Sequence, residues 1–302
     1  MTAPRVVAVV VTFEPEDEAL AALLERLGNQ CDAVVVVDNG STTAPAQACA
    51  GTGAELIALP TNEGIAAAQN RGIARTVELA ADFVLLSDQD SLPAQDMVAR
   101  LLEAIATAAA AGSPVAGVGP VSSDNRAESG EMVYVSRRWG PRRAAPNDTR
   151  PDGLVEVAFL IASGCLIPAT VLEEVGAMNG GWFIDHIDLE WCLRARRAGY
   201  RLFAVTGAHL GHELGERVTR VPGRKQLVHV QSVPRTYYMT RNTILLVRSG
   251  LLSTAWRLGY LVWLAKYLAF NAVFVAPRWQ RIRLMARGLG DGLRGVTGPL
   301  RG

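Results

Sequence analysis

The chain has 302 residues, 49% of them hydrophobic, and its formal net charge at pH 7 is +1. That length suffices for one large domain, or one domain with an appendage, and the balanced charge argues against a nucleic-acid-binding surface spread over the molecule. The four cysteines are scattered without metal-finger spacing and the N-terminus has no secretory signal pattern, so we expect core thiols and a cytoplasmic catalytic body.

The N-terminal part, roughly the first 120 residues, alternates strand and helix patterns, which is typical of a parallel sheet with crossover helices. Short apolar runs rich in valine and leucine predict the strands. Leucine and alanine at helical spacing predict the helices between them. Strands are expected at residues 5–12, 33–38, 54–59, 82–87 and 115–121, and helices are expected to begin at Pro15, after the second strand, after Gly64 and at Pro93.

A polar segment follows at residues 122–153, rich in Ser, Asp, Asn, Arg, Pro and Gly. A structureless loop of about 30 residues is unusual inside a compact domain. Within it, residues 131–139 have the pattern of a hairpin arm. The segment is therefore either a mobile surface loop or a flap over the acceptor site.

Beyond this segment the chain returns to regular patterns. Strands are expected at residues 155–161 and 200–205, with a helix beginning near Asp188 between them, and the chain then becomes helical and increasingly apolar. The predicted class is α/β, with a mostly parallel sheet flanked by helices over residues 1–230 and a helical C-terminal extension over residues 231–302.

Two of the predicted strands end in acidic residues. The second strand ends at Asp38, and the fourth runs into Asp88-Gln89-Asp90. An open α/β sheet binds its ligand beyond the carboxyl ends of its strands. Two carboxylates separated by one residue suit a hard cation, Mg²⁺ or Mn²⁺. Helix capping by Asp90 or Ser91 is the alternative, but it explains only one carboxylate, and two close carboxylates repel each other unless a cation holds both ionised.

A third acidic segment, FIDHIDLEW at residues 183–191, contains Asp185, Asp188 and Glu190. Asp185 or Asp188 could serve only as a negative charge at a helix N-terminus. The functional alternative makes one of them a general base for an incoming hydroxyl group. The helix N-terminus would lower the pKa of that carboxylate, so positioning would have to matter more than basicity.

Asn62, Gly64 and Asn70 are candidates for a second wall of the same site. Asn62 could instead cap the helix that follows, while the N-terminus of that helix would favour a phosphate group. Asp38 likewise belongs to a set of residues that turns prefer. His212 is either a third metal ligand or a structural histidine.

The segment RTYYMTRN at residues 235–242 places Arg235, Tyr238, Arg241 and Asn242 near one face of a helix. Guanidinium groups on that face would match phosphate oxygens. The alternative is an amphipathic surface helix with buried tyrosines.

Residues 258–276 form a stretch of nineteen residues with one charge, Lys266. Its length lies near the lower limit for a membrane-spanning helix. Aromatic residues along it and the arginines that follow favour a helix lying on an anionic bilayer. A buried helix or an oligomer interface is the main alternative, and a single span is the least favoured. The aromatic and basic residues are Trp256, Tyr260, Trp263, Tyr267, Arg278, Arg281, Arg283 and Arg287.

These segments together resemble the family 2 glycosyltransferases, and within them the bacterial rhamnosyltransferase-like group. The resemblance covers roughly residues 5 to 300 and rests on ordered motifs. It implies a GT-A fold and an inverting, metal-dependent transfer from a nucleotide sugar. The motifs are VVVTF, VVDNGS, NEGIAAAQNRGI, LLSDQDS, FIDHIDLEWCLRARRAGY, HLGHELGE and RTYYMTRN.

The resemblance also implies roles for individual residues. Asp188 aligns with the catalytic base, and Asp90 would bind Mg²⁺ or Mn²⁺ with His212 as a further ligand. Ile187 stands where the family usually has Glu, which leaves Asp185 as a rival base, although the rhamnosyltransferase-like group shows the same Asp-x-x-Asp arrangement. The residues implied for the nucleotide sugar are Thr12, Glu14, Asp38, Asn62, Gly64, Asn70 and Asp88.

The subgroup suggests dTDP-L-rhamnose as donor, with UDP-galactofuranose or another deoxysugar nucleotide as alternatives. The expected acceptor is a hydroxyl of a lipid-linked saccharide or polysaccharide of the cell envelope, at the inner face of the cytoplasmic membrane, and a homo-oligomer stays open. Two other classes compete. A nucleotidyltransferase would usually have a Gly- and Lys/Arg-rich phosphate loop near the first strand, where this chain has TFEP. A catalytically silent, membrane-docked scaffold would not need the acidic residues.

Overall fold

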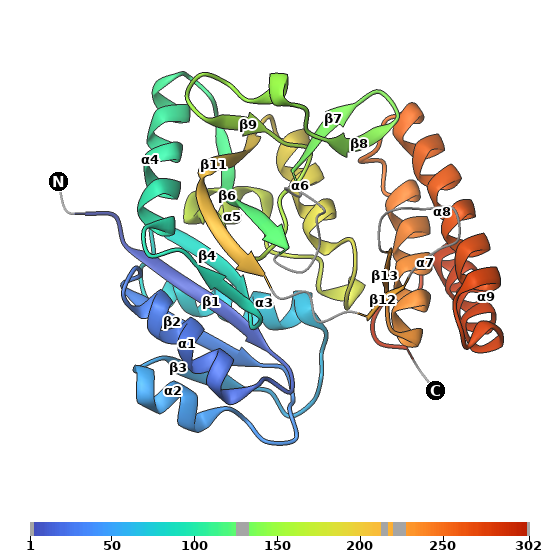
Figure 1. Ribbon diagram of the computed structural model, residues 1–302, viewed down its shortest axis with the longest axis horizontal. Coiled ribbons are helices and arrows are strands. Elements are labelled where there is room, and N and C mark those ends of the chain that lie inside the picture. The colour runs from blue at the N-terminus through green and yellow to red at the C-terminus, as the bar shows by residue number, and fades with distance from the viewer. Residues whose placement is uncertain (1–2, 125–132, 213–216, 220–227, 301–302) are drawn as a thin grey trace.

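A computed structural model of the chain describes residues 3–124, 133–212, 217–219 and 228–300. Within these residues, a nine-stranded sheet carries helices on both faces, and three further helices lie beside it at the C-terminal end (Figure 1). The predicted α/β class with a helical C-terminal extension is confirmed.

The strands of the main sheet lie in the order β3-β2-β1-β4-β10-β6-β11-β5, and β9 pairs with β11. Strands β3, β2, β1, β4, β6 and β11 run in one direction, and β10, β5 and β9 run against them. The sheet is therefore mostly parallel. Its strands are β1 (Val6–Thr12), β2 (Ala33–Asp38), β3 (Glu55–Ala58), β4 (Phe83–Asp88), β5 (Ser91–Pro93), β6 (Val115–Asp124), β9 (Leu154–Glu156), β10 (Cys165–Pro168) and β11 (Arg201–His212).

The helices and two small hairpins complete the described structure. The helices are α1 (Asp17–Gly28), α2 (Ala46–Thr52), α3 (Ile65–Glu78), α4 (Met97–Ala110), α5 (Ala169–Val175), α6 (Ile187–Arg197), α7 (Val233–Arg248), α8 (Thr254–Phe274) and α9 (Arg278–Arg294). The hairpins pair β7 (Tyr134–Arg137) with β8 (Gly140–Arg143) and β12 (Arg217–Thr219) with β13 (Val228–Val230).

Strand β1 lies at the centre of two hydrophobic cores because successive side chains of a strand point to opposite faces. Val6 and Ala8 pack with leucines of α1 and with Leu101 of α4. Val7 and Val9 pack on the other face with residues of α3, α5 and α6. Both faces of the strand are covered, which explains why its sequence is continuously apolar rather than alternating.

Three boundaries differ from the prediction. The helix expected at Pro93 begins at Met97, because Ser91–Pro93 forms β5 and pairs with β11. The strand expected at 155–161 is limited to β9, and residues 157–161 are irregular. The strand expected at 200–205 continues through His212, where it pairs with both β6 and β5. The hairpin arm predicted at 131–139 is found as β7–β8, with residues 131 and 132 outside the described part of the chain.

The C-terminal helices pack against one another, α7 with both α8 and α9. Helix α8 also contacts the β7–β8 hairpin, and the two lie side by side in Figure 1. No helix in the part of the chain that the structure describes is both long enough and apolar enough to cross a membrane.

Candidate active site

The acidic strand ends meet at one edge of the sheet, as expected from the parallel register. Thr12 pairs with Asp38 across β1 and β2, and Val11 pairs with Asp88 across β1 and β4. The Thr12 hydroxyl donates to Asp38 at 3.0 Å. The carboxyl ends of three neighbouring strands thus form the floor of a ligand site.

Asp38 and Glu14 organise the turn that follows β2. Asp38 is buried and accepts hydrogen bonds from the Ser41 hydroxyl at 2.6 Å and from the Ser41 N–H at 3.0 Å. Glu14 accepts from the N–H and the hydroxyl of Thr42 at 2.9 and 2.8 Å. These bonds from Thr42, the backbone one first, lower the pKa of Glu14. Both carboxylates shape the wall of the site through this turn.

Asn62 and Gly64 connect that wall to the acidic segment at residues 183–188. The Asn62 carbonyl oxygen accepts from the Asn39 amide at 3.1 Å and from the Gly64 N–H at 3.0 Å, so it orders the turn rather than capping α3. Gly64 has φ +91°, and a Cβ there would lie 2.6 Å from the Cα of Phe183. The next N–H, of Ile65, donates to the Phe183 carbonyl at 2.7 Å. Only glycine permits this approach.

Asn70 also acts through the backbone of a distant segment. Its amide donates to the Met178 carbonyl at 2.8 Å and its carbonyl oxygen accepts from the Met178 N–H at 2.9 Å. Both polar ends of the side chain are therefore engaged in holding α3 against this segment. The expected contact of Asn70 with the nucleotide sugar stays a prediction.

The Asp88-Gln89-Asp90 segment is fixed from both sides. The Gln89 side chain accepts from the Phe13 N–H at 2.7 Å and donates to the Phe13 carbonyl at 3.2 Å. The Asp88 N–H donates to the Ser163 hydroxyl at 3.4 Å. Helix α4 begins at Met97, with Asp96 as its N-cap residue, so capping of this helix is not the role of Asp90.

The described side chains alone do not complete a metal site at this segment. Among the described residues, no group of three His, Cys, Asp or Glu side chains is placed to hold a metal ion. The backbone of His212 pairs with Ser91, the residue after Asp90, so β11 brings His212 to the same strand end. Mg²⁺ is commonly held by one or two carboxylates together with substrate phosphates. The donor set at Asp88 and Asp90 fits that mode of binding.

The segment before α6 has a strained backbone. Phe183, Asp185 and His186 have positive φ angles of 65°, 68° and 63°. Such conformations cost roughly 1–3 kcal/mol per residue and persist only where the surrounding structure holds them. Their clustering beside a row of carboxylates marks this segment as functional.

Asn242 of α7 holds the strained segment in place. Its side-chain amide nitrogen lies 2.9 Å from the Trp182 carbonyl, 2.7 Å from that of Ile184 and 2.9 Å from that of Asp185. Asn242 is fully buried, so these bonds are not exchanged with water. The segment RTYYMTRN thus contributes to the site through Asn242, which the sequence interpretation placed on the same helix face without assigning it a role.

Arg235 and Asp185 form an ion pair across the same contact. An Arg235 guanidinium nitrogen lies 2.5 Å from an Asp185 carboxylate oxygen, and the Asp185 side chain is only 2% exposed. Arg235 therefore neutralises Asp185. Asp185 is a poorer candidate for the general base than Asp188.

Arg241 and Tyr238 lie inside the C-terminal packing. Arg241 is fully buried and donates to the Gly298 carbonyl at 2.6 Å, with its guanidinium over the ring of Tyr238 at 5.1 Å. The Tyr238 hydroxyl accepts from the Leu300 N–H at 2.8 Å, and its ring stacks on Phe183. The predicted phosphate or acceptor contacts for these two residues are corrected, because both side chains are committed to the interior.

Asp188 lies in the first turn of α6 at the boundary between two parts of the site. Its carboxylate accepts from the Ala162 N–H at 3.1 Å. Burial raises its pKa to about 7, and the negative charge of Asp88 adds to the increase. Burial thus outweighs the lowering that we expected from the helix N-terminus. A carboxylate with a pKa near 7 suits a general base, and Asp188 is close enough to Asp88 to feel the charge of the donor side.

A cavity of about 400 Å³ opens on the other side of Asp188. His186 also lines it, with a ring nitrogen 2.9 Å from the Thr243 hydroxyl, and burial lowers the His186 pKa to about 4, which keeps the ring neutral. His186 is a site residue that the sequence interpretation missed. The cavity is lined by Tyr134, Trp139, Gly140, Pro141, Arg142, Phe159, His186, Asp188, Leu189, Gly259, Tyr260 and Trp263.

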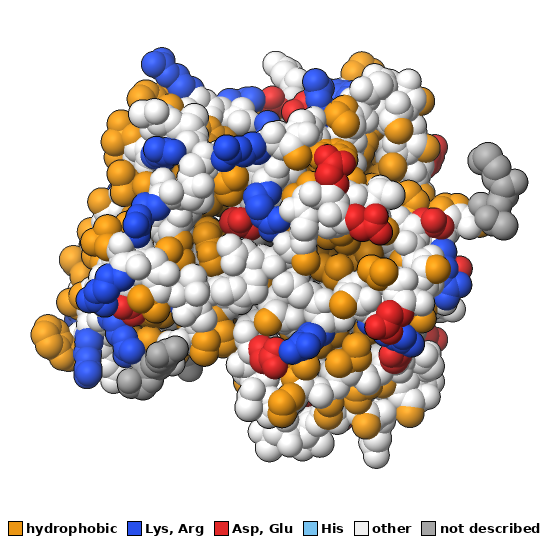
Figure 2. All heavy atoms as spheres, turned by 180° about the vertical axis from the view of Figure 1, so that it is seen from behind, with side chains coloured by type: hydrophobic (Ala, Val, Ile, Leu, Met, Phe, Trp, Pro, Cys, Tyr) orange, Lys and Arg blue, Asp and Glu red, His pale blue; other side chains and the backbone are white. Residues whose placement is uncertain are grey.

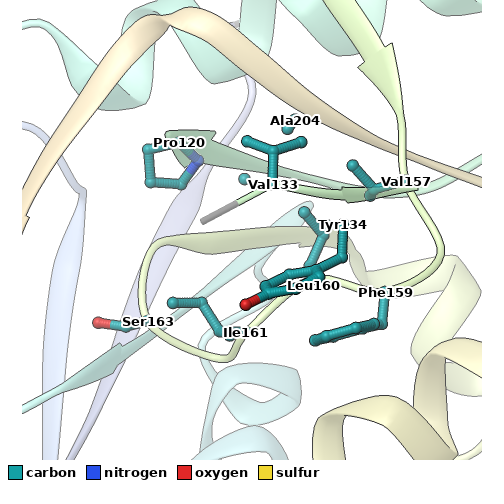
Figure 3. A pocket seen from close by; sticks show the side chains of 10 residues that line it. Pro120, Val133, Tyr134, Val157, Phe159, Leu160, Ile161, Ser163 and Ala204 are labelled. Carbon is teal, nitrogen blue, oxygen red and sulfur yellow. The ribbon is translucent and has the colours of Figure 1, made fainter. Parts of the chain in front are cut away.

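A second cavity of about 20 Å³ lies behind the first. Figure 3 shows the rings of Tyr134 and Phe159 close together on its wall, with Ser163 at some distance from them. Tyr134 and Phe159 stack with ring centroids 5.6 Å apart and line both cavities. The small cavity has room for little more than a water molecule, so the larger one is the candidate ligand space.

Comparisons with known proteins agree with this arrangement. The family model described as Glycosyl transferase family 2 matches residues 8–175. The chain is 30% identical over 298 residues, 97% of each chain, to a Shigella flexneri protein described as dTDP-rhamnosyl transferase RfbF. GalNAc-T7, solved with UDP, GalNAc and Mn²⁺, has a TM-score of 0.56 at 12% identity, over 91% of this chain and 58% of that chain. S. aureus TarS 1–349, solved with UDP-GlcNAc, has a TM-score of 0.54 at 16% identity, over 97% of this chain and 81% of that one.

Proposed function

Because this chain belongs to glycosyltransferase family 2, we propose that it is an inverting, metal-dependent rhamnosyltransferase. The donor is dTDP-L-rhamnose, and the acceptor is a hydroxyl group of a lipid-linked saccharide or polysaccharide in cell-envelope biosynthesis. The choice of donor rests on the relative described as a dTDP-rhamnosyl transferase, which aligns over 97% of both chains.

The position of Asp188 is the observation that carries the proposal. The carboxylate lies between the strand-end floor, whose Asp88 raises its pKa, and the 400 Å³ cavity that it lines. The acceptor hydroxyl attacks the anomeric carbon from the face opposite the nucleoside diphosphate, and Asp188 takes the hydroxyl proton. The bond to the diphosphate breaks with its electron pair, so one displacement inverts the anomeric carbon.

The strand-end floor would hold the donor. Thr12, Asp38 and Asn62 form the nucleotide wall, and Asp88 meets the ribose or the sugar. Asp90, with His212 from β11, would hold Mg²⁺ or Mn²⁺. When bound, the cation offsets negative charge that develops on the leaving diphosphate. GalNAc-T7, with Mn²⁺ and UDP in its structure, supports this assignment by its fold.

The outer faces of α8 and α9 are proposed to dock on the inner face of the cytoplasmic membrane. Figure 2 shows basic and apolar side chains intermingled on the side of the molecule where the C-terminal helices lie. A basic and apolar face of this kind binds anionic lipid. The residues are Leu258, Leu261, Val262, Phe274, Trp279 and Ile282, all exposed, with the exposed cations Arg257, Lys266, Arg278, Arg283 and Arg287.

Arg281, which the sequence placed among these cations, is not part of that surface. It is 3% exposed and donates to the Gln231 carbonyl at 2.8 Å and to the Asn271 side chain at 3.2 Å. It instead joins α9 to α8 and to the residues before α7.

Calorimetry tests the donor site. The wild-type chain is titrated with dTDP, UDP and GDP, with and without Mn²⁺, in parallel with Asp90→Ala. Mn²⁺-dependent binding of dTDP that the mutant loses supports the proposal. Selective binding of UDP would move the donor to UDP-galactofuranose, and binding of no nucleotide by the folded wild type would favour a silent scaffold.

A further inference from the structure

We infer that the 400 Å³ cavity between the β7–β8 hairpin and α8 binds one sugar ring of the acceptor against aromatic side chains, with Trp139 and Trp263 as its main contacts. The inference rests on the proposed function, since it assigns the second substrate of the same reaction. The sequence offered the hairpin arm as a flap over the acceptor site but did not indicate that α8 forms the other wall, because the two walls are separated by more than a hundred residues.

The β7–β8 hairpin is held against α8 by two contacts. The Trp256 indole N–H donates to the Arg137 carbonyl at 2.8 Å. One turn further along the helix, a Cβ on Gly259 would lie 2.0 Å from the Trp139 carbonyl oxygen. The backbone of the hairpin tip therefore rests directly on α8 at a position that only glycine allows. This contact with α8 places the Trp139 side chain at the cavity.

Trp139 and Trp263 are partly exposed, with Arg138 over one face of the Trp139 ring and Tyr267 stacked on one face of Trp263. Trp139 is 46% exposed and Trp263 is 40% exposed, although both line the cavity. Tyr260 and Trp263 lie edge to face with centroids 6.5 Å apart, and Tyr134 stacks on Phe159. Aromatic faces carry partial negative charge, so they attract the partly positive C–H groups on the flat face of a pyranose ring.

The polar groups of the cavity favour a saccharide over an acyl chain. Arg142, His186 and Asp188 line the same space as the aromatic rings. A mainly aromatic lining with a few polar groups, in a volume of about 400 Å³, is typical of a small-molecule site. An acyl chain would leave those groups without partners, whereas the hydroxyl groups at the rim of a sugar can bond to them.

The cavity also has the correct position for the reaction. Asp188 belongs to its lining, so a sugar stacked on the aromatic rings can direct one hydroxyl group to the base. Asp88, on the donor side, does not line the cavity but is near enough to Asp188 for its charge to act on that carboxyl. The two substrates would therefore meet at this carboxylate.

Saturation-transfer NMR tests the inference with methyl glycosides of rhamnose, glucose, galactose, mannose and N-acetylglucosamine, in the presence of dTDP and Mn²⁺. We expect at least one glycoside to bind the wild type. Trp139→Ala should weaken its binding at least tenfold, and Trp139→Phe should restore most of the loss by keeping an aromatic face. Trp279→Ala is the matched control, because Trp279 is 76% exposed on α9 and does not line the cavity.

Separate dTDP titrations distinguish failure of the proposed function from failure of the acceptor-site inference alone. Loss of dTDP binding in the wild type would count against the proposed function. If dTDP binds but no glycoside does, or if a glycoside binds Trp139→Ala as tightly as the wild type, the acceptor-site inference is overturned. Thermal melting of each variant shows whether the fold is intact.

Discussion

Asp185 and Arg235 are joined by an ion pair with a shortest distance of 2.5 Å, and this contact separates the roles of two carboxylates three residues apart. The charge of Asp185 is matched by the guanidinium, and its backbone is held by Asn242. Among the described residues no cation pairs with Asp188, on the first turn of α6, and its carboxylate instead accepts the Ala162 N–H. One carboxylate therefore anchors the strained segment, and the other has the environment of a base.

Replacing Asp188 with Asn should abolish most transfer without harming the fold. A positioned general base contributes about 10²–10⁴-fold, so kcat should fall within that range. The amide is isosteric and still accepts the Ala162 N–H, so dTDP affinity should change little and the protein should stay folded. Asp185→Asn should mainly lower the melting temperature, because it removes the charge of the buried carboxylate that pairs with Arg235. If steady-state rates and melting curves instead show that Asp185→Asn loses most activity and Asp188→Asn mainly lowers the melting temperature, the roles of the two carboxylates are exchanged.

The pH dependence of kcat/KM should follow the ionisation of Asp188. Its pKa is raised to about 7 by burial and by Asp88, so the protonated, inactive form dominates below that pH. We expect kcat/KM to fall about tenfold per unit on the acid side of pH 7 and to level off above it. Rates measured at substrate concentrations well below KM, with constant ionic strength, provide the test. The residual rate of Asp188→Asn should lack this acid limb, and an inflection near pH 4 in the wild type would refute the assignment.

The free energy of unfolding should decrease as the pH rises towards 7, whereas kcat/KM increases. A carboxyl whose pKa is higher in the folded state than in the unfolded state opposes folding once it must ionise, so its contribution worsens from about pH 4 to pH 7. Asp188→Asn should therefore raise the free energy of unfolding at pH 8 relative to the wild type and have almost no effect at pH 4. Urea unfolding at both pH values measures the difference. Equal effects at both pH values would mean that Asp188 is not held in an unfavourable charged state.

The sequence predicted the parts of the site that depend on parallel strands. Asp38 and Asp88 end buried strands, so their meeting at one edge follows from sheet geometry alone. The bond between Ala162 and Asp188 could not be foreseen, because the segment before β10 has no regular pattern. Arg241 was misassigned because spacing identifies a helix face and not what covers that face.

The prediction that a helix begins at Pro93 was wrong for a related reason. Residues 91–93 carry a helix-start pattern, yet they form β5 because the end of β11 lies beside them and offers unpaired backbone groups. Similarly, the aromatic spacing of α8 was interpreted as membrane-facing, whereas Tyr260 and Trp263 also line the cavity. Both outcomes depend on contacts between segments far apart in the chain, which local patterns do not encode.

Gly259→Ala should displace the hairpin and impair acceptor use selectively. The new Cβ would stand 2.0 Å from the Trp139 carbonyl oxygen, so the hairpin tip must move away from α8. We expect the KM for the acceptor glycoside to rise at least tenfold with dTDP affinity unchanged. Gly290→Ala is the control, since it is also a helical glycine and its nearest neighbour is the flexible end of Arg294. Equal acceptor KM values for the two variants would show that the contact between Gly259 and the hairpin does not shape the cavity.

The C-terminal helices should bind anionic vesicles through their outer face. Val262 on α8 is 48% exposed and Val77 on α3 is 63% exposed, so the same Val→Asp change at each position compares two exposed valines. We expect the wild type and Val77→Asp to sediment with phosphatidylglycerol vesicles, and Val262→Asp to bind them several-fold more weakly. Binding should decrease with added salt, because each basic residue near an anionic surface contributes about 1 kcal/mol of screened attraction. The proposal would be contradicted if the wild type does not bind these vesicles and Val262→Asp has a lower mass by sedimentation in free solution than the wild type. The apolar face would then be an interface between copies of the chain.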